Sequence, residues 1–319
     1  MARNLITTLA DNNFIEPAKQ LFSSIFHKSG WNGDYMLLSY NIPEKKLDWF
    51  RNKGILIKKC QPLYAKRIGL KNRPPIVISK FYLFTEEFKK WDNIVYIDAD
   101  ATVRAALNEL ADVKGFAAVQ SSSNLRQQFD CSKMIKSLKV EQSYQKLKKR
   151  YNLNSKAFNS GVMAFSTKII KKETFFKLLA TFHEYNTIHT HGDQPTLNLH
   201  FYKKWRKLPN LYNIRPDRTI EHSRIKPQNL KGIILHFRHW ATKDYFLNEW
   251  KQNLDDAELI DLSKRKKALK SWRREEIIIY SMYLKGTQLI DRTVGLIGIW
   301  LRYIFPAAYF RLKSMLKPR

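Results

Sequence analysis

Two carboxylates separated by one residue, Asp98 and Asp100, are the side chains of this sequence best suited to chemistry. They follow a short apolar, β-branched and aromatic run, Ile94–Ile97, which is too brief for a helix and is typical of a buried strand. Because alternate side chains of a strand share a face, we expect both carboxylates to point the same way. Oxygen ligands of this kind suit a hard or borderline cation such as Mg²⁺ or Mn²⁺. A solvated turn is the alternative interpretation of the bare tripeptide.

Three further polar residues are candidates for the site, and each also has an ordinary structural interpretation. His236 follows an apolar run and could complete a metal site, or it could be an ordinary buried histidine. Asp193 precedes a helix led by Pro195 and could serve only as its N-cap. Lys80 lies in a segment with helical spacing and could be a solvated lysine.

Alternating strand and helix patterns must position these residues. We expect strands over 4–9, 35–39, 54–58, 94–97, 116–120, 162–165, 207–214 and 232–236, and helices over 14–26, 45–52, 76–89, 133–150 and 172–185. Such alternation predicts an α/β fold with a mostly parallel sheet covered on both faces. In open sheets of this class, ligands bind beyond the carboxyl ends of the strands, where Asp98 and Asp100 are expected.

Composition limits the classes of partner. The chain has 319 residues, an apolar content of 44% and a formal charge of +29, so a globular core is available and anions should be attracted. Nucleic acid, anionic lipid headgroups and phosphorylated substrates all fit that charge. The two cysteines have no metal-ligand spacing, and no signal peptide is evident, so we expect an intracellular, cytoplasmic protein.

The order of four short motifs resembles a known family. IDAD (97–100), FNSGV (158–162), GDQ (192–194) and LHF (235–237) are similar to the retaining sugar-nucleotide glycosyltransferases of family 8. This group contains glycogenin and the bacterial lipopolysaccharide galactosyl- and glucosyltransferases. The resemblance covers about residues 4–250. It implies a GT-A fold, a Rossmann-like mixed sheet flanked by helices.

The resemblance also implies ligands and their residues. Mn²⁺ (or Mg²⁺) would be held by Asp98, Asp100 and His236 and would bridge the diphosphate of a UDP-sugar donor. Contacts to the donor are implied for Thr8, Leu9, Asp11, Phe14, Lys80 and Asp98. Asn159, Asp193 and Gln194 match positions that line the donor sugar and the reacting face. No residue matches a covalent nucleophile, so retention is expected by substitution on one face of the sugar.

One motif departs from the family pattern. The family's late histidine is usually followed by a glycine and a Lys-Pro-Trp segment that grips the diphosphate, whereas this chain has HFRHWATKDYF. Lys243 is the nearest equivalent of the phosphate-binding lysine. Arg238 and His239 could contact phosphate in its place.

The C-terminal part of the chain differs in composition from the rest. We predict a catalytic domain over residues 1–250 and a basic, aromatic helical tail over 251–319. From Ser263 to Arg319 there are 14 Lys and Arg against 3 Asp and Glu. A basic amphipathic helix of this kind can lie in the headgroup layer of an anionic membrane, although it could also pack on the catalytic domain. The first interpretation predicts a peripheral protein on the cytoplasmic face of a membrane.

We therefore expect a metal-assisted hexosyltransferase that uses a UDP-hexose and a glycan or lipid-linked glycan acceptor. A basic nucleic-acid-binding protein would also explain the charge, but no nucleic-acid-binding signature is evident and no specific nucleic acid is expected. A nucleotidyltransferase on a similar sheet is a further alternative. It would require a Gly-rich phosphate loop after the first strand, and residues 9–14 contain no glycine.

Overall fold

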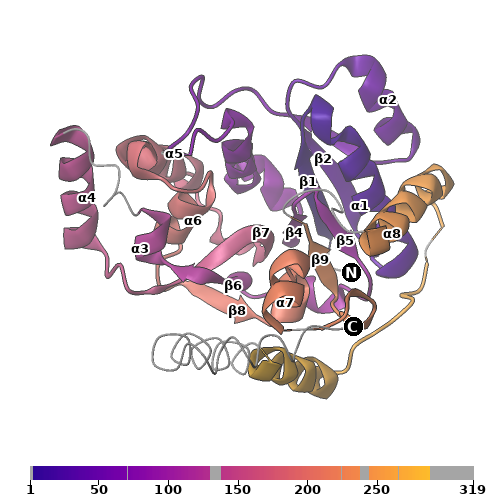
Figure 1. Ribbon diagram of the computed structural model, residues 1–319. Helices are drawn as coiled ribbons and strands as arrows, with labels where there is room; N and C mark the ends of the chain where they lie inside the picture. The colour runs from indigo at the N-terminus through magenta and orange to yellow at the C-terminus, as the bar shows by residue number, and fades with distance from the viewer. Residues whose placement is uncertain are drawn as a thin grey trace, which may run out of the picture.

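The centre of the protein is a mixed seven-stranded sheet flanked by helices, with strand order β3-β2-β1-β4-β7-β6-β8 (Figure 1). The structure is a computed structural model that describes residues 3–69, 71–129, 138–223, 225–237, 244–264 and 266–287. The strands of the sheet are β1 (Asn4–Ala10), β2 (Asp34–Ser39), β3 (Leu56–Lys59), β4 (Asn93–Ile97), β6 (Phe116–Asn124), β7 (Lys156–Ser166) and β8 (Trp205–Leu208). A separate two-stranded sheet joins β5 (Ala101–Val103) to β9 (Ile234–His236).

Most strand pairs of the large sheet are parallel, as the alternation of strands and helices predicts. β1 pairs in parallel with β2 and β4, β2 with β3, and β6 with β8. β7 is the exception, because it runs antiparallel to both of its neighbours, β4 and β6. The sheet is therefore mixed, as the family resemblance implies.

The central strand β4 is apolar from Ile94 to Ile97 because both of its faces are buried. In β4, Val95 and Ile97 belong to one hydrophobic core, whereas Ile94 and Tyr96 belong to another. The period of two in a strand sends alternate side chains to opposite faces of the sheet. A strand between two cores therefore has a continuous apolar sequence, and this pattern predicts β4.

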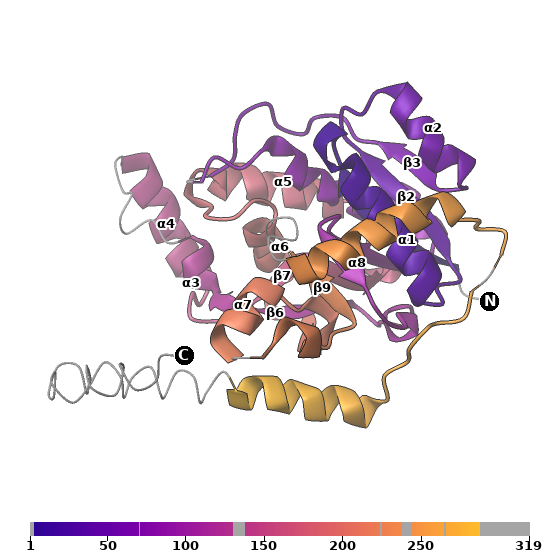
Figure 2. The same cartoon turned by 45° about the vertical axis from the view of Figure 1, so that its right-hand side comes forward.

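Helices cover both faces of the sheet. They are α1 (Ile15–Lys28), α2 (Glu44–Asn52), α3 (Leu125–Gln128), α4 (Leu138–Arg150), α5 (Thr174–Tyr185), α6 (Gln194–His200), α7 (Pro216–Ser223) and α8 (Asp244–Asp255). Short 3-10 helices are η1 (Asn12–Phe14), η2 (Pro75–Phe84), η3 (Glu86–Lys90), η4 (Asn108–Leu110), η5 (Thr167–Ile169), η6 (Asn186–Ile188), η7 (Asn210–Asn213), η8 (Pro227–Asn229) and η9 (Asp256–Leu259). α1 and α8 lie side by side, and α5 and α6 are neighbours on the other side of the molecule (Figures 1 and 2).

Two predicted elements differ from those observed. The helix expected over 76–89 is two 3-10 helices, η2 and η3, which meet at the extended residue Thr85. Most of η2 is buried, so no polar face marks an α-helical period. The strand expected over 207–214 ends at Leu208 and continues as η7. Pro209 separates the two, since its ring removes a ladder donor.

In the part of the chain that the structure describes, two α-helices follow the last strand. α8 runs across residue 250 and packs on α1, and a further helix occupies residues 274–287. The predicted tail from residue 288 onward lies outside the described residues. The domain division at residue 250 stays a prediction. Among the described residues, no helix has the length and apolar character needed to cross a membrane.

Candidate functional site

Asp98 and Asp100 lie in the turn that follows β4, not on a continuous strand. The Asp98 N–H donates to the Gly161 carbonyl at 2.8 Å, and the Ala101 N–H donates to the Asp98 carbonyl at 3.1 Å. The chain therefore reverses tightly between β4 and β5. We expected the two carboxylates to share a face because alternate side chains of a strand do so. That reason is wrong, because a turn brings them together.

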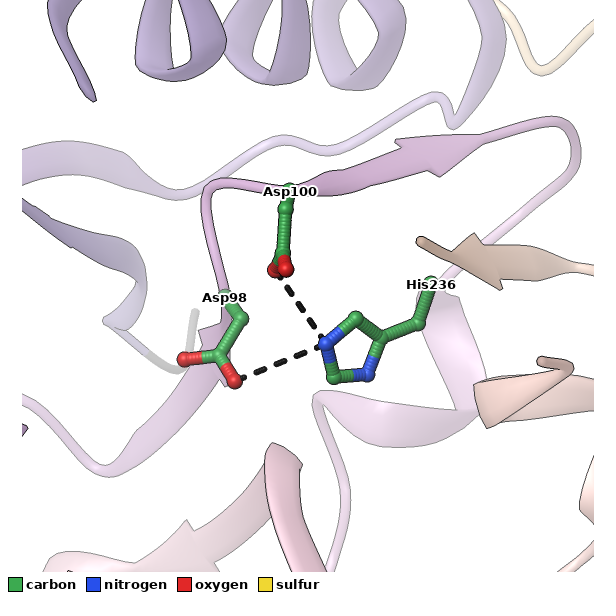
Figure 3. A group of neighbouring side chains, drawn as sticks. All are labelled: Asp98, Asp100 and His236. Atoms are coloured by element: carbon green, nitrogen blue, oxygen red, sulfur yellow. Dashed lines mark ion pairs between the residues drawn. The ribbon is translucent and has the colours of Figure 1, made fainter. Parts of the chain in front are cut away.

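His236 reaches the carboxylates through the small sheet. β5 follows the acidic turn and pairs antiparallel with β9, which places Ala101 opposite His236. The Nε2 atom of His236 lies 3.1 Å from Oδ1 of Asp100 and 3.7 Å from Oδ2 of Asp98 (Figure 3). Burial disfavours the charged imidazole, but the two carboxylates outweigh burial and raise the pKa of His236.

These three side chains form a group that could hold a metal ion. One ligand atom from each lies within 4.8 Å of the others. Two carboxylates and an imidazole are a donor set that suits Mn²⁺, and also Mg²⁺ with its preference for oxygen. The chemistry of the residues present therefore fits the divalent ion that the sequence resemblance implies.

Gly161 leaves the space that the His236 ring occupies. A Cβ atom on residue 161 would lie 2.2 Å from Cε1 and 2.7 Å from Nδ1 of His236. Real Cβ atoms do not approach ring atoms so closely, so any larger residue must displace the imidazole or the backbone of β7. The glycine of the FNSGV motif is thus explained by packing against the histidine.

A chain of amides fixes the other side of the imidazole. The Nδ1 atom of His236 lies 2.9 Å from Oδ1 of Asn213, and Nδ2 of Asn213 donates to Oδ1 of Asn159 at 2.8 Å. Asn159 in turn donates to Oε1 of Gln194 at 3.1 Å. Asn213 was missed by the sequence analysis, because it lies in η7, where a strand was expected.

Lys80 connects the acidic turn to the GDQ motif. Its side chain is buried, with Nζ 2.9 Å from Oδ1 of Asp98 and 3.3 Å from Oδ2 of Asp193. Burial alone would lower the pKa of Lys80, but the two carboxylates outweigh it and raise that pKa, so the ammonium stays charged. Lys80 is therefore not the solvated lysine considered from the sequence.

The two carboxylates beside Lys80 differ in their surroundings. Burial raises the pKa of Asp98, but Lys80 and His236 outweigh it and lower that pKa overall. For Asp193, burial prevails over Lys80 and raises the pKa. Asp193 precedes α6 in the N-cap position, yet its side chain makes no cap hydrogen bond. Its carboxylate faces Lys80 instead, so helix capping does not explain this residue.

A cavity of about 510 Å³ joins these groups. We call it the donor cavity, because the sequence analysis expects a nucleotide-sugar donor at these residues. Of the residues predicted for the site, the structure brings to its lining Leu9, Asp11, Phe14, Lys80, Asp98, Asp100, Asn159, Asp193, Gln194 and His236. Thr8 is fully buried in β1 and is not among the lining residues. Lys243, Arg238 and His239 lie outside the described residues.

Several cationic residues of the donor cavity escaped the sequence analysis. Its lining includes Lys71, Arg73, Arg215 and Arg218. Within a chain that carries 57 Lys and Arg, composition could not single out these four. Lys71 and Arg73 lie in the loop before η2, and Arg215 and Arg218 lie at the start of α7. No sequence motif identifies either segment.

Comparisons with known proteins identify the family and the fold. The sequence profile described as glycosyl transferase family 8 matches residues 5–243. The galactosyltransferase LgtC, solved with donor and acceptor sugar analogues, is similar with a TM-score of 0.57 and 15% identity, over 85% of this chain and 98% of LgtC. A search of curated proteins finds no significant match.

Two longer glycosyltransferases are also similar in structure. The apo form of GlyE from Streptococcus pneumoniae TIGR4 matches with a TM-score of 0.55 and 19% identity, over 82% of this chain and 61% of GlyE. The bifunctional WbbM apo structure matches with a TM-score of 0.57 and 17% identity, over 82% of this chain and 52% of WbbM. The chain thus spans about half the length of WbbM. At these identities the likeness shows the fold, a GT-A sheet.

Proposed function

The chain belongs to glycosyl transferase family 8, and from this premise we propose that it transfers a hexose from a UDP-sugar to a hydroxyl of a glycan acceptor. We propose that the reaction retains the configuration of the sugar and uses a divalent ion. Because the family is shown, the nucleic-acid-binding and nucleotidyltransferase alternatives are not proposed. The observation that carries the proposal is the convergence of Asp98, Asp100 and His236 in one cavity with Lys80 and Gln194.

The divalent ion, Mn²⁺ or Mg²⁺, would be held by Asp98, Asp100 and His236. When bound, it would supply positive charge that stabilises the diphosphate as UDP departs. Asn213 holds the His236 ring by its Nδ1 atom, and Gly161 leaves the ring its space. The chain's own residues therefore orient the ligands before any ion arrives.

The donor is expected to lie along the cavity between β1 and α6. Leu9, Asp11 and Phe14 line one end, and we assign them to the uracil and ribose. Phe14 is 37% exposed, so its ring is accessible to a base. Thr8 supports this end from within β1. Lys80 and Lys243 are assigned to the diphosphate side of the donor.

Asn159, Asp193 and Gln194 are proposed to surround the transferred sugar. Asp193 would accept hydrogen bonds from sugar hydroxyls, and Gln194 would lie near the anomeric carbon. In the proposed step the bond from this carbon to the phosphate oxygen breaks, and the bond to the acceptor oxygen forms on the same face. The acceptor proton passes to the departing phosphate oxygen, so charge and atoms balance without an enzyme nucleophile.

We further propose that the acceptor is lipid-linked and that the enzyme works peripherally on the cytoplasmic face of a membrane. The helix at residues 274–287 supports this. It buries Ile277 and Leu284 against the domain, while Ile279, Met282 and Tyr283 are exposed. Apolar residues on one helical face, within a strongly basic segment, suit the headgroup layer of an anionic bilayer.

The function is tested by measuring UDP release from a panel of UDP-hexoses, without acceptor, in Mn²⁺ and in EDTA. Metal-dependent release from one member would support the donor and the metal together, and product analysis of transfer would give the configuration. Calorimetry with UDP and Mn²⁺ provides a second measurement that needs no turnover. Absence of both UDP release and UDP binding in the folded protein would reject the UDP-sugar donor.

A further inference from the structure

A second cavity of about 690 Å³ adjoins the donor cavity. Asn159 and Gln194 line both cavities, so the second opens onto the place assigned to the reacting sugar. We call it the basic cavity, because its lining includes five cationic side chains: Lys71, Lys207, Arg215, Arg218 and Lys285. Within the described part of the chain, no Asp or Glu is among the lining residues.

Two of these cations belong to the basic cavity alone. Lys207, at the end of β8, and Lys285, on the helix at 274–287, do not line the donor cavity. Both side chains are exposed to solvent. Partial desolvation lowers the pKa of Lys207, and the charges of Lys285 and Lys156 lower it further. Like charges gathered at one cavity repel each other, so a bound anion would relieve that repulsion.

The two arginines are already oriented by neighbours. Arg215 is paired with Asp217, with its Nη2 atom 2.9 Å from Oδ2, so part of its charge is balanced. Arg218 donates to Oγ of Ser122 at 2.7 Å. The excess positive charge of the cavity therefore comes mainly from the lysines, and the arginines supply preoriented hydrogen-bond donors.

The remainder of the lining suits a sugar. Ser121, Ser122 and Ser123 on β6 offer hydroxyl groups, and the amides of Gln120 and Gln127 offer both donors and acceptors. Buried apolar side chains, among them Val119, Ile214 and Leu284, also contribute to the wall. Mixed amide, hydroxyl and apolar surfaces match the hydroxyl groups and C–H faces of a glycan.

We propose that the basic cavity holds the acceptor, and that this acceptor is an anionic glycan carrying a phosphate or a carboxylate near the receiving hydroxyl. The inference rests on the proposed function, since it takes the donor cavity as the place of the transferred sugar. Because Asn159 and Gln194 line both cavities, a glycan in the basic cavity would lie next to the place assigned to the anomeric carbon. Phosphate and carboxylate share the chemistry that the lysines recognise.

Calorimetry with three sugars tests this in the presence of saturating UDP and Mn²⁺, so that the diphosphate site is filled. The probes are mannose 6-phosphate, glucuronic acid and neutral mannose. We expect an anionic sugar to bind with roughly millimolar affinity or better and mannose to bind at least tenfold more weakly. Binding of mannose 6-phosphate alone would identify phosphate as the group, and binding of glucuronic acid alone would identify carboxylate.

Two double variants sharpen the result. Lys207→Gln with Lys285→Gln should weaken the anionic sugar at least tenfold, whereas Lys207→Arg with Lys285→Arg should retain it. Lys168→Gln with Lys172→Gln removes the same charge from exposed lysines outside the cavity and should have little effect. The proposal would be overturned if the control variant lost as much affinity for the anionic sugar, or if mannose bound as tightly as the anionic sugars. It would also be overturned if neither anionic sugar bound at roughly 10 mM.

The failure of this inference can be separated from failure of the proposed function. UDP release by the wild-type chain, without any acceptor, reports on the donor site. Release without anionic binding would reject the acceptor class and leave the transferase intact. Anionic binding without UDP release or UDP binding would reject the UDP-sugar donor and leave the basic cavity as a binding site for anionic sugars.

Discussion

The Oδ1 atom of Asn213 lies 2.9 Å from the Nδ1 atom of His236. An amide oxygen can only accept a hydrogen bond, so Nδ1 must carry the hydrogen. A neutral ring then presents the lone pair of Nε2 to the side where Asp98 and Asp100 lie. Asn213 is therefore a positioning residue for the metal site, although it comes from η7 and no motif pointed to it.

This relationship predicts a difference between two substitutions. Asn213→Leu removes the acceptor and should lower Mn²⁺ affinity by roughly 10- to 100-fold, because partners of metal-bound histidines set ring orientation and basicity. Asn213→Asp keeps the acceptor oxygen for Nδ1 but loses the donor to Asn159, so it should retain more of the affinity than the leucine variant does. Titration with Mn²⁺ followed by electron paramagnetic resonance measures both.

The exposed Asn229 offers a matched control. Asn229→Leu should leave Mn²⁺ affinity unchanged. Equal affinities for the leucine and aspartate variants at position 213 would show that the hydrogen bond to Nδ1 does not position the ring.

Asp100 lies closer to the histidine than Asp98 does, and its substitution tests the metal assignment directly. Asp100→Asn should reduce metal-dependent UDP release by about a hundredfold or more, since the variant loses a charged ligand at the departing diphosphate. The fold should persist, because the side chain is isosteric. Thermal unfolding and Mn²⁺ titration accompany the activity assay, and exposed Asp255→Asn serves as the control. Near-normal release would remove Asp100 from the site.

Gly161 is predicted to tolerate no side chain. In Gly161→Ala the new methyl group would meet the His236 ring at 2.2 Å, so we expect weaker Mn²⁺ binding and a loss of about 1 to 3 kcal/mol in the free energy of unfolding. Urea denaturation and Mn²⁺ titration measure these effects.

Gly286 provides the matching control for that substitution. It lies in the helix at 274–287, and a Cβ there meets nothing within 4 Å. Gly286→Ala should therefore stabilise the protein by up to about 1 kcal/mol, because alanine is the better helix former. Wild-type metal affinity in Gly161→Ala would contradict the packing account.

The sequence predicted the elements whose surroundings are simple. β4 has an apolar run bounded by polar residues because it is buried on both faces, and its end correctly placed the acidic turn. The approach of His236 to Asp100 did not follow from local pattern. It depends on the pairing of β5 with β9, two short strands far apart in the chain. The expectation that His236 joins the two carboxylates came instead from the order of the motifs, which resembles that of the family.

Other parts of the site were beyond local reasoning for physical reasons. Asn213 lies in η7, beyond Pro209, where apolar spacing resembles a strand but the chain coils. Lys207 and Lys285 are ordinary surface residues by sequence, and only the fold brings β8 near the helix at 274–287. Such contacts are decided by tertiary packing, which no periodicity within a window records.

A second ionic cluster, formed by Glu249, Arg104 and Lys28, should make stability depend on pH. Glu249 on α8 accepts from Arg104 at 2.9 Å and lies 3.3 Å from the Lys28 ammonium. Burial raises the pKa of Glu249, but Arg104 and Lys28 outweigh it and lower that pKa below the usual 4.5. The stabilisation is thus complete above about pH 4.5 and disappears as pH falls through the folded-state pKa.

Glu249→Gln should therefore lose about 1 to 3 kcal/mol of unfolding free energy at neutral pH. The difference from wild type should shrink as the pH falls below about 4.5, where the Glu249 carboxylate of the unfolded chain takes up a proton, and should vanish at the lower pH where the folded-state carboxylate is protonated as well. Urea denaturation over this range measures the effect, with the exposed Glu221→Gln as control. A difference that stays constant with pH would mean that the charge of Glu249 is not its source.

The exposed face of the helix at 274–287 makes membrane attachment testable without removing the tail. Ile279 and Met282 are each 66% exposed, and they lie three residues apart on one side of the helix. If this side enters the headgroup layer, Ile279→Glu with Met282→Glu should weaken binding to anionic vesicles at least tenfold. The reason is that each substitution removes about 1.5 to 3 kcal/mol of apolar burial and adds a repelled charge.

Phe176 on α5 is 67% exposed and provides a control of equal accessibility on another surface. Phe176→Glu should leave vesicle binding nearly unchanged, and added salt should weaken the wild type, because basic side chains contribute. Sedimentation with phosphatidylserine-containing vesicles measures all three proteins. If the helix variant binds as tightly as wild type, or the control loses as much, this face does not contact lipid.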